Sequence, residues 1–347
     1  MRFIDLLLVF IPITLILGFF VTQDPLILFV SSVLAIVPLA AKMGEATEEL
    51  GKHYGGHIGG LLNATFGNSA ELIIALIAIN SGLIDLVKAS LTGAIIGNLL
   101  FVLGFSMLVA GFKYKEQKVS QSLAGMNSTM LLIAFMCIMI PSVFHLFPGH
   151  TLTKEYNFSI IVSILLLLVY VASLGFSLIT HKHLFMAEHK KEKPKWSKRK
   201  AMSMLALATI ALVLMSEVLV GQVEQVAKNF GLSEIFIGAV IIAIIGNAAE
   251  HLAAIFFALK NDIDVAINIT VGSSLQIAMF VAPVCVLVGE LLMNQPMDLV
   301  FTPLEIIAVF SSVLIVNEIS NDGKFNWFEG LQLIVMYAII AALFFFI

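Results

Sequence analysis

The chain has 347 residues, of which 60% are hydrophobic and 12% are charged, and its mean hydropathy is +1.03. Soluble domains carry about 25% charged residues, so this chain cannot cover a water-facing surface of its size, and the lipid bilayer must be its main solvent. The net charge of −4 is small for this length and argues against a nucleic-acid partner.

Eleven apolar runs are long enough to cross about 30 Å of hydrocarbon as helices. The first, residues 4–22, lacks a small-residue cleavage site before Pro25, so we interpret it as a retained span and not a signal peptide. The others cover residues 25–41, 58–80, 83–111, 122–141, 158–180, 201–220, 233–259, 264–289, 299–317 and 328–347. The sequence therefore predicts an all-α polytopic membrane protein.

The basic residues test this span count independently. With eleven spans the loops alternate between two sides, and sixteen Lys and Arg residues fall on one side, against Lys88, Lys154 and Lys228 on the other. By the positive-inside rule, we expect the N-terminus in the cytoplasm and the C-terminus outside. Because we find no organellar targeting segment or large soluble domain, we expect a multi-pass protein of a prokaryotic plasma membrane.

The longest polar segment, residues 181–200, separates two halves of the chain. It could bind lipid head groups, and His181 and His183 could hold a metal ion. A plain cytoplasmic linker explains it more simply. We divide the chain into an N-terminal helix (1–22), a first five-helix repeat (25–180), the basic linker (181–200) and a second five-helix repeat (201–347).

The two halves share a motif at a shift of 179 residues. The segment GNSAE at Gly67–Glu71 falls on GNAAE at Gly246–Glu250. Three further identities keep the same shift: Asp85 with Asp264, Gly93 with Gly272 and Phe101 with Phe280. Five spans lie between equivalent points, so the second copy enters the membrane from the opposite face. Inverted repeats of this kind build secondary transporters, whose site lies near the midplane between the repeats.

Each repeat places one carboxylate in the middle of the bilayer. Glu71 lies about thirteen residues into its span and Glu250 about seventeen, which at 1.5 Å per residue is well inside the hydrocarbon. An unpaired charge there costs several kcal/mol. A single glutamate could stay protonated and bond to a neighbouring helix, but two at equivalent positions predict a shared ion site.

The residues before each glutamate suggest the remaining ligands. Gly67 and Gly246 stand about one turn earlier and are followed by Asn68 and Asn247. Glycine tolerates distortion and asparagine competes with helical hydrogen bonds, so we expect the helix to open there and to free carbonyl oxygens. Two carboxylates with carbonyl and amide oxygens suit a hard cation such as Ca²⁺, whereas zinc or copper would call for Cys or His ligands. We expect no resident cofactor beyond the transported ion.

The next span of each repeat adds a polar residue. Asn98 follows Glu71 by 27 residues, and Gln276 follows Glu250 by 26. Both are candidate ligands, although hydrogen bonding between helices explains them as well. Ser273 and Ser274 are weaker candidates, because serine is common in membrane helices.

Several motifs resemble the signatures of the calcium/proton exchanger family, within the cation/calcium exchanger superfamily. Gly59–Ile73 resembles the first signature and Gly246–His251 the second, while Glu45–Leu50 and Ser216–Glu217 also match the family pattern. The resemblance implies a first helix followed by two inverted five-helix halves. It also implies that the paired glutamates bind Ca²⁺ with help from the glycine carbonyls, and that the two amides are polar neighbours of the site.

The resemblance further implies protons as the counter-ion. Sodium-coupled relatives tend to carry Thr or Ser in the turn before the glutamate and often a further carboxylate in the next span, whereas this chain carries Gly-Asn and amides. We therefore expect an antiporter, not an enzyme, that exports Ca²⁺ for H⁺ by alternating access while both ions compete for Glu71 and Glu250. Buried neighbouring carboxylates hold protons more tightly than solvated ones. A homo-oligomer is possible.

Alternatives stay open from the sequence. A sodium-coupled exchanger would use the same scaffold, whereas a cation channel or an intramembrane metallohydrolase fits less well. His251 could relay protons or simply pack. Other carboxylates could guide cations or only mark solvated helix ends: Glu45, Glu48, Glu49, Glu217, Glu305 and Glu318.

Overall fold

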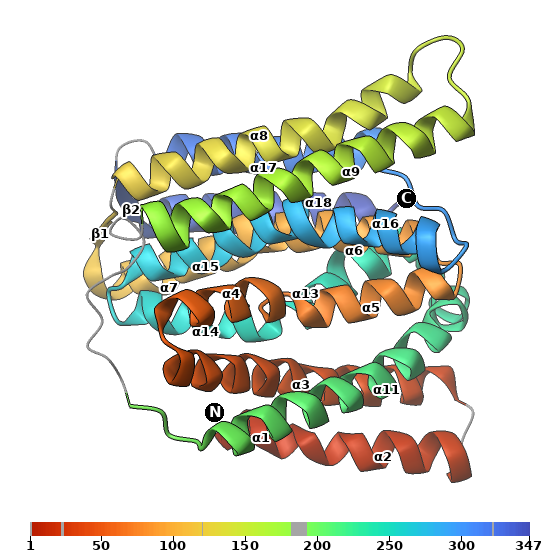
Figure 1. Ribbon diagram of the computed structural model, residues 1–347, viewed down its shortest axis with the longest axis horizontal. Coiled ribbons are helices and arrows are strands. Elements are labelled where there is room, and N and C mark those ends of the chain that lie inside the picture. Colours follow the sequence, from red (N-terminus) through yellow and green to blue (C-terminus); the bar gives the residue numbers. More distant parts are fainter. Residues whose placement is uncertain (1, 22–23, 120, 182–192, 321–322) are drawn as a thin grey trace.

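The computed structural model describes residues 2–21, 24–119, 121–181, 193–320 and 323–347, and these residues are almost entirely helical. The long helices run side by side along one direction (Figure 1). An N-terminal segment of short helices precedes the first half: α1 (Arg2–Asp5), η1 (Leu6–Val9), α2 (Phe10–Ile16) and η2 (Leu17–Val21).

The two halves contain similar series of helices interrupted by π-helical turns. The first half comprises α3 (Pro25–Tyr54), α4 (Gly56–Phe66), α5 (Ser69–Asn80), α6 (Ile84–Ile96), η3 (Gly97–Val102), α7 (Leu103–Tyr114), α8 (Gln121–His145), α9 (Leu152–Gly175) and η4 (Phe176–Thr180). The second comprises α11 (Lys198–Phe230), α12 (Glu234–Phe236), η5 (Ile237–Ile242), α13 (Ala243–Gly246), α14 (Ala248–Leu259), α15 (Ile263–Gln276), η6 (Ile277–Val281), α16 (Ala282–Leu292), α17 (Pro303–Ser320) and α18 (Trp327–Phe345).

The predicted fold class is confirmed, but the predicted count of eleven spans is not. Among the described residues, nine helices are long and apolar enough to cross a membrane, or ten if the bent pair Glu234–Gly246 and Ala248–Leu259 is one span. The first predicted span is the shorter apolar helix Leu6–Val21. The start of α3 is well defined, because the Asp24 side chain caps it by accepting hydrogen bonds from two backbone amides, and Pro25 follows at the first helical position.

The second predicted span was set too short. The sequence predicted an end near residue 41, where charged residues begin, but α3 continues to Tyr54. Its last turns are held by ion pairs between Lys42 and Glu45 and between Lys52 and Glu48. Charged side chains spaced three or four residues apart support a helix outside the hydrocarbon, so loss of hydropathy does not mark the end of the helix.

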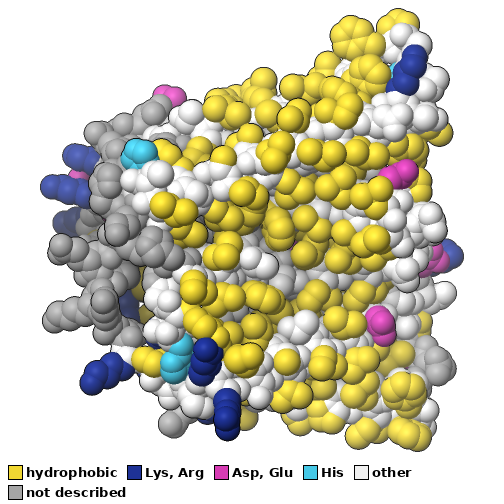
Figure 2. Space-filling model, in the orientation of Figure 1, with side chains coloured by type: hydrophobic (Ala, Val, Ile, Leu, Met, Phe, Trp, Pro, Cys, Tyr) yellow, Lys and Arg dark blue, Asp and Glu magenta, His cyan; other side chains and the backbone are white. Residues whose placement is uncertain are grey.

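The molecule has one basic end. Figure 2 shows the Lys and Arg side chains mostly at one end of the apolar band, and in Figure 1 the N- and C-termini lie toward opposite ends. At the basic end, β1 (Glu116–Lys118) pairs antiparallel with β2 (Lys324–Asn326), with Gln117 opposite Phe325. This small ribbon, which the sequence did not predict, joins the two halves outside the helices.

The halves also meet backbone to backbone where α6 packs on η5. A Cβ atom added to Gly93 in α6 would lie 2.5 Å from the carbonyl carbon of Ala239 in η5, and one added to Gly238 would lie 2.7 Å from the Leu86 carbonyl oxygen. Glycine is needed at both positions because any side chain would force the helices apart. At Gly272, the repeat equivalent of Gly93, nothing lies within 4 Å of an added Cβ. The repeats are therefore packed tightly at one of two equivalent crossings.

Candidate cation site

Both Gly-Asn motifs interrupt their helices. The helix stops at Phe66 and resumes at Ser69, with Asn68 at φ −103° and ψ 30°. In the second half it stops at Gly246 and resumes at Ala248, and the two pieces are bent by 60°. A break is present in each repeat, and each glutamate lies in the first turn of the helix after it. The freeing of carbonyl oxygens at these breaks stays a prediction.

Glu71 points at the other repeat. An added Cβ on Gly246 would lie 3.3 Å from Glu71 Cγ and 3.4 Å from Oε1, so the side chain rests against the second Gly-Asn break. The Glu71 side chain is buried, with 9% of the residue exposed. Among the described residues, neither carboxylate oxygen has a hydrogen-bond partner. A buried carboxyl group with two unpartnered oxygens is suited to hold a proton or a cation.

Glu250 is placed differently. Glu250 is partly exposed in the first turn of α14. Glu71 lies near enough for the two carboxylates to interact electrostatically. Gly67, which the repeat would place against Glu250, instead faces Gln276: its added Cβ would lie 3.4 Å from Oε1 of that amide. The two carboxylates thus share one region but not one environment, and the repeat symmetry is broken at the site.

The predicted amide ligands form a network between the repeats. Asn68 Nδ2 donates to Gln276 Oε1 (2.7 Å), and Ser273 Oγ lies 2.8 Å from Asn68 Oδ1 and 3.3 Å from Asn247 Oδ1. Asn98 Nδ2 donates to Ser273 Oγ (3.1 Å) and lies 3.4 Å from Asn247 Oδ1. Interhelical hydrogen bonding therefore describes these amides in this conformation. Each amide oxygen has a second lone pair, so a ligand role stays a prediction.

Ser273 is more central than the sequence suggested. Its hydroxyl contacts both breaks, whereas Ser274 donates to the Thr270 carbonyl of its own helix (2.9 Å). The π-helical turns η3 and η6 lie at equivalent places, with Asn98 inside the first and Gln276 just before the second. Such turns are frequent at functional sites, because the extra residue re-aims the side chains around it.

His251 joins the same network. Its Nε2 lies 3.1 Å from Asn98 Oδ1, and the ring is buried. The contact matches the packing and hydrogen-bonding interpretation, and the relay of protons stays a prediction.

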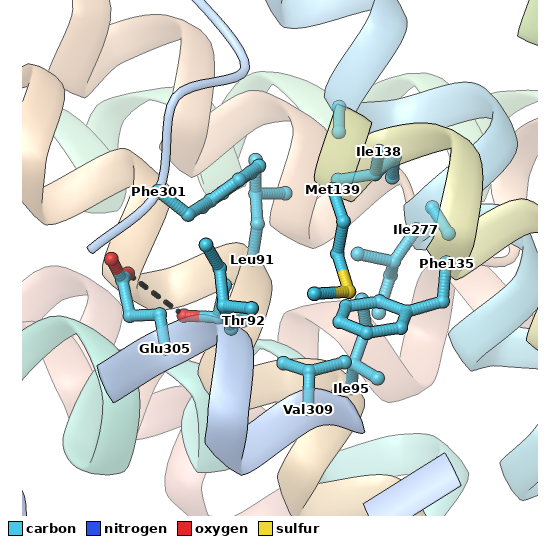
Figure 3. Close-up of a pocket in the computed structure, with 13 residues that line it drawn as sticks. Leu91, Thr92, Ile95, Phe135, Ile138, Met139, Ile277, Phe301, Glu305 and Val309 are labelled. Atoms are coloured by element: carbon cyan, nitrogen blue, oxygen red, sulfur yellow. Dashed lines mark hydrogen bonds between the residues drawn. The ribbon is translucent and has the colours of Figure 1, made fainter. Parts of the chain in front are cut away.

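Several other carboxylates have structural partners. Glu305 forms a capping box with Thr302 at the start of α17. It also accepts a hydrogen bond from Thr92 Oγ1 (3.1 Å; Figure 3). The adjoining cavity is largely apolar and about 20 Å³, room for about one water molecule. Glu217 and Glu318 are exposed, and their role in an access path stays a prediction.

Glu49 anchors the basic linker. Its carboxylate is buried, accepts hydrogen bonds from the backbone amides of Lys195 (2.6 Å) and Trp196 (2.8 Å), and pairs with Lys52. It therefore holds a chain segment and does not stand free to attract cations. The predicted pair of linker histidines falls partly outside the described residues, because His183 belongs to the segment 182–192.

The side of the site toward the basic end is more open. In α4, the polar residues Asn63 and Thr65 are exposed in the turns just before Gly67, and α4 packs mainly on α3. On the opposite side, Glu71 lies in a tight space of about 10 Å³ lined by residues such as Ala94 and Ile242. The conformation is closed at the end away from the basic linker.

Known proteins share this architecture. A family model described as sodium/calcium exchanger protein matches residues 25–179 and 200–346. The Ca(2+)/H(+) antiporter ChaA of Bacillus subtilis is 47% identical over 92% of this chain and 92% of its own, and the Ca(2+)/H(+) antiporter of Aphanothece halophytica is 44% identical over 98% and 95%. The solved structure of native YfkE superposes with a TM-score of 0.87 at 42% identity, covering 99% of this chain and 100% of that one.

Proposed function

The chain belongs to the sodium/calcium exchanger protein family, and we propose that it is an antiporter that exchanges Ca²⁺ for H⁺ at Glu71 and Glu250. The observation that carries the proposal is the Glu71 carboxyl group, which is buried against the opposite repeat with both oxygens unpartnered among the described residues. The names of the relatives at 44–47% identity point to the same pair of ions.

The burial of Glu71 explains why the two ions would exclude one another. A bare carboxylate in this position costs several kcal/mol, so the group must be neutralised either by a proton or by a bound cation. Ca²⁺ needs the deprotonated form as a ligand, so each ion binds only where the other has left. Competition for one carboxylate pair couples the two fluxes without a separate proton site.

The unequal crossings of the repeats support alternating access. The Gly93–Ala239 crossing is closed, whereas the equivalent position Gly272 is uncovered. In an inverted repeat, exchanging these two arrangements would close the basic end and open the other. A site that is neutralised by either ion can pass through the closed state, while an empty charged pair resists it.

Protons are favoured over sodium by the residues around the pair. Asn68 donates to Gln276, and Asn98 donates to Asn247 and Ser273. No further carboxylate is hydrogen-bonded in this network among the described residues. An additional cation would need additional negative oxygen ligands. A site with two carboxylates balances one Ca²⁺ or two protons.

The bacterial relatives and the distribution of charge support a multi-pass protein of a plasma membrane. The N-terminal segment and the basic linker would lie on the cytoplasmic side, because Lys and Arg gather at that end (Figure 2). In this orientation the site in the present conformation opens to the cytoplasm, where an exporter collects Ca²⁺.

The test is ⁴⁵Ca²⁺ uptake into proteoliposomes that hold either a proton gradient or a sodium gradient. We expect accumulation against the Ca²⁺ gradient with the proton gradient alone, and its loss in Glu71→Gln and Glu250→Gln. Glu224→Gln, which removes an exposed carboxylate of α11, is the matched control and should transport normally. Uptake driven only by sodium would reject protons, flux only down the Ca²⁺ gradient would reject exchange, and robust exchange by both site variants would reject the site.

A further inference from the structure

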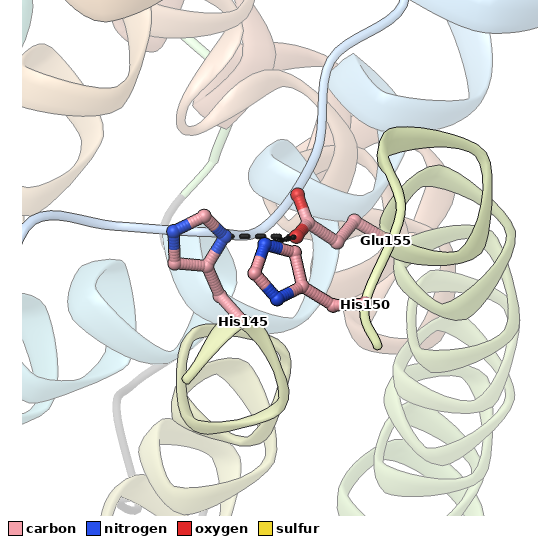
Figure 4. A group of neighbouring side chains, drawn as sticks. All are labelled: His145, His150 and Glu155. Atoms are coloured by element: carbon pink, nitrogen blue, oxygen red, sulfur yellow. Dashed lines mark hydrogen bonds and ion pairs between the residues drawn. The ribbon is translucent and has the colours of Figure 1, made fainter. Parts of the chain in front are cut away.

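A group of three metal-ligating side chains lies far from the glutamate pair, at the end of the molecule opposite the basic linker. His145 is the last residue of α8, His150 lies in the connecting loop and Glu155 is in the first turn of α9 (Figure 4). One nitrogen of each ring and one carboxylate oxygen all lie within 4.8 Å of one another. The function proposed above makes no use of this group.

The distances are close to those of a tetrahedral metal site. His145 Nδ1 lies 2.8 Å from Glu155 Oε1, and His150 Nε2 lies 3.5 Å from the same oxygen. Ligand atoms about 2.0–2.1 Å from a zinc ion stand roughly 3.3 Å apart in a tetrahedron. Small side-chain rotations would therefore place all three atoms around one ion and leave the fourth position for water.

The tautomer of His150 is already set for this role. Its Nδ1 lies 3.0 Å from the Phe147 carbonyl oxygen, which accepts only, so Nδ1 carries the hydrogen. In the neutral ring, Nε2 then has a free lone pair facing Glu155. Metal-binding histidines usually have their second nitrogen held in this way, because the contact fixes both the orientation and the tautomer of the ring.

The backbone around the group is also ordered. Thr151 caps α9 by accepting from the Lys154 amide, and Lys154 Nζ donates to the Gly149 carbonyl (3.1 Å), which closes the loop that carries His150. Glu155 is buried with 2% of the residue exposed, whereas both imidazoles are partly exposed. A buried carboxylate beneath two accessible rings forms a site that an ion could enter from solution.

We propose that His145, His150 and Glu155 bind a divalent transition metal ion, with Zn²⁺ as the fitting probe, on the face opposite the basic linker. Two imidazole nitrogens and one carboxylate suit zinc and its neighbours, whereas Ca²⁺ takes six to eight oxygen ligands. The ion would join the end of α8 to the start of α9. It would be distinct from the transported ion in position and in chemistry.

The test measures Zn²⁺ binding to the full chain in detergent, with any affinity tag removed, by competition with a colorimetric chelator. Glu71→Gln and Glu250→Gln are present throughout, so zinc at the transport site cannot be counted. We expect His145→Gln with His150→Gln to bind one zinc ion fewer per chain. His53→Gln, which removes a histidine at the basic end, is the control and should bind as many as the parent.

A second measurement protects the test against misfolding. Zinc that binds only the folded state raises the midpoint of thermal unfolding, and this rise should disappear in the double histidine variant while its midpoint without metal stays near that of the parent. Equal zinc binding in the parent and the double variant would overturn the proposal. Displacement of the zinc by millimolar Ca²⁺ would also overturn it, because an ion that prefers oxygen ligands should not compete for a site with two imidazole nitrogens.

Discussion

Alanine at Gly93 should destabilise the observed conformation much more than alanine at Gly272. The two glycines are equivalent in the repeat, and both lie inside helices. At Gly93 an added Cβ would lie 2.5 Å from the Ala239 carbonyl carbon and closer still to its oxygen and Cα, short of ordinary contact by about 1 Å, and the obstacle is backbone that cannot rotate away. At Gly272 nothing lies within 4 Å.

The size of the difference follows from packing. Both substitutions gain the same helix propensity, about 1 kcal/mol, so that gain cancels in the comparison. The remaining cost at Gly93 is that of overpacking, about 1–3 kcal/mol. A factor of ten in an equilibrium constant is about 1.4 kcal/mol. The population of the observed conformation, in which Gly93 lies against Ala239, would therefore fall roughly five- to 150-fold relative to the conformation in which this contact is open.

The assay is thermal unfolding of both variants in detergent without Ca²⁺, followed by ⁴⁵Ca²⁺ exchange in proteoliposomes. We expect the unfolding midpoint of Gly93→Ala to lie below that of Gly272→Ala, whose midpoint should equal or exceed that of the parent. Exchange should slow in both, because an alternating-access cycle needs each crossing to close once. Equal loss of stability in the two variants would refute the reasoning, since it would mean that the crossings are packed alike.

Three further outcomes are expected. The apparent KM for Ca²⁺ should rise as the pH at the Ca²⁺-binding side falls, by up to about tenfold per pH unit for each displaced proton; a KM independent of pH in the uptake assay would contradict competition. Glu305→Ala should lower stability by about 0.5–2 kcal/mol, because the capping box is lost, while Ca²⁺ exchange is kept. A variant that is stable but does not exchange Ca²⁺ in the same two assays would show that Glu305 takes part in ion transport. Ser273→Ala should cost about 1–3 kcal/mol of stability and slow exchange, because it leaves Asn68 Oδ1 without its donor, whereas Ser274→Ala should be nearly neutral in both measurements.

The sequence by itself determined the features that depend on local composition and on the repeat. Hydropathy predicted the long helices, since the bilayer admits few other structures for apolar runs of that length. The shift of 179 residues located the two glutamates and the Gly-Asn breaks, because glycine and asparagine weaken a helix wherever they occur together. The span predicted at residues 25–41 is shorter than α3 (Pro25–Tyr54), because hydropathy alone does not mark helix ends.

Only the tertiary structure decided which residues meet. Gly93 and Gly272 occupy equivalent positions of the repeat, yet an added Cβ on Gly93 would meet the Ala239 backbone, whereas nothing lies within 4 Å of one on Gly272, because the two halves pack differently in this conformation. The partners of Ser273, Glu49 and Glu305 likewise come from packing with segments distant in the chain or from a local cap. Hydrogen-bond partners and the grouping of His145 with Glu155 depend on helix rotation and loop geometry. Neither of these can be predicted from the sequence pattern alone.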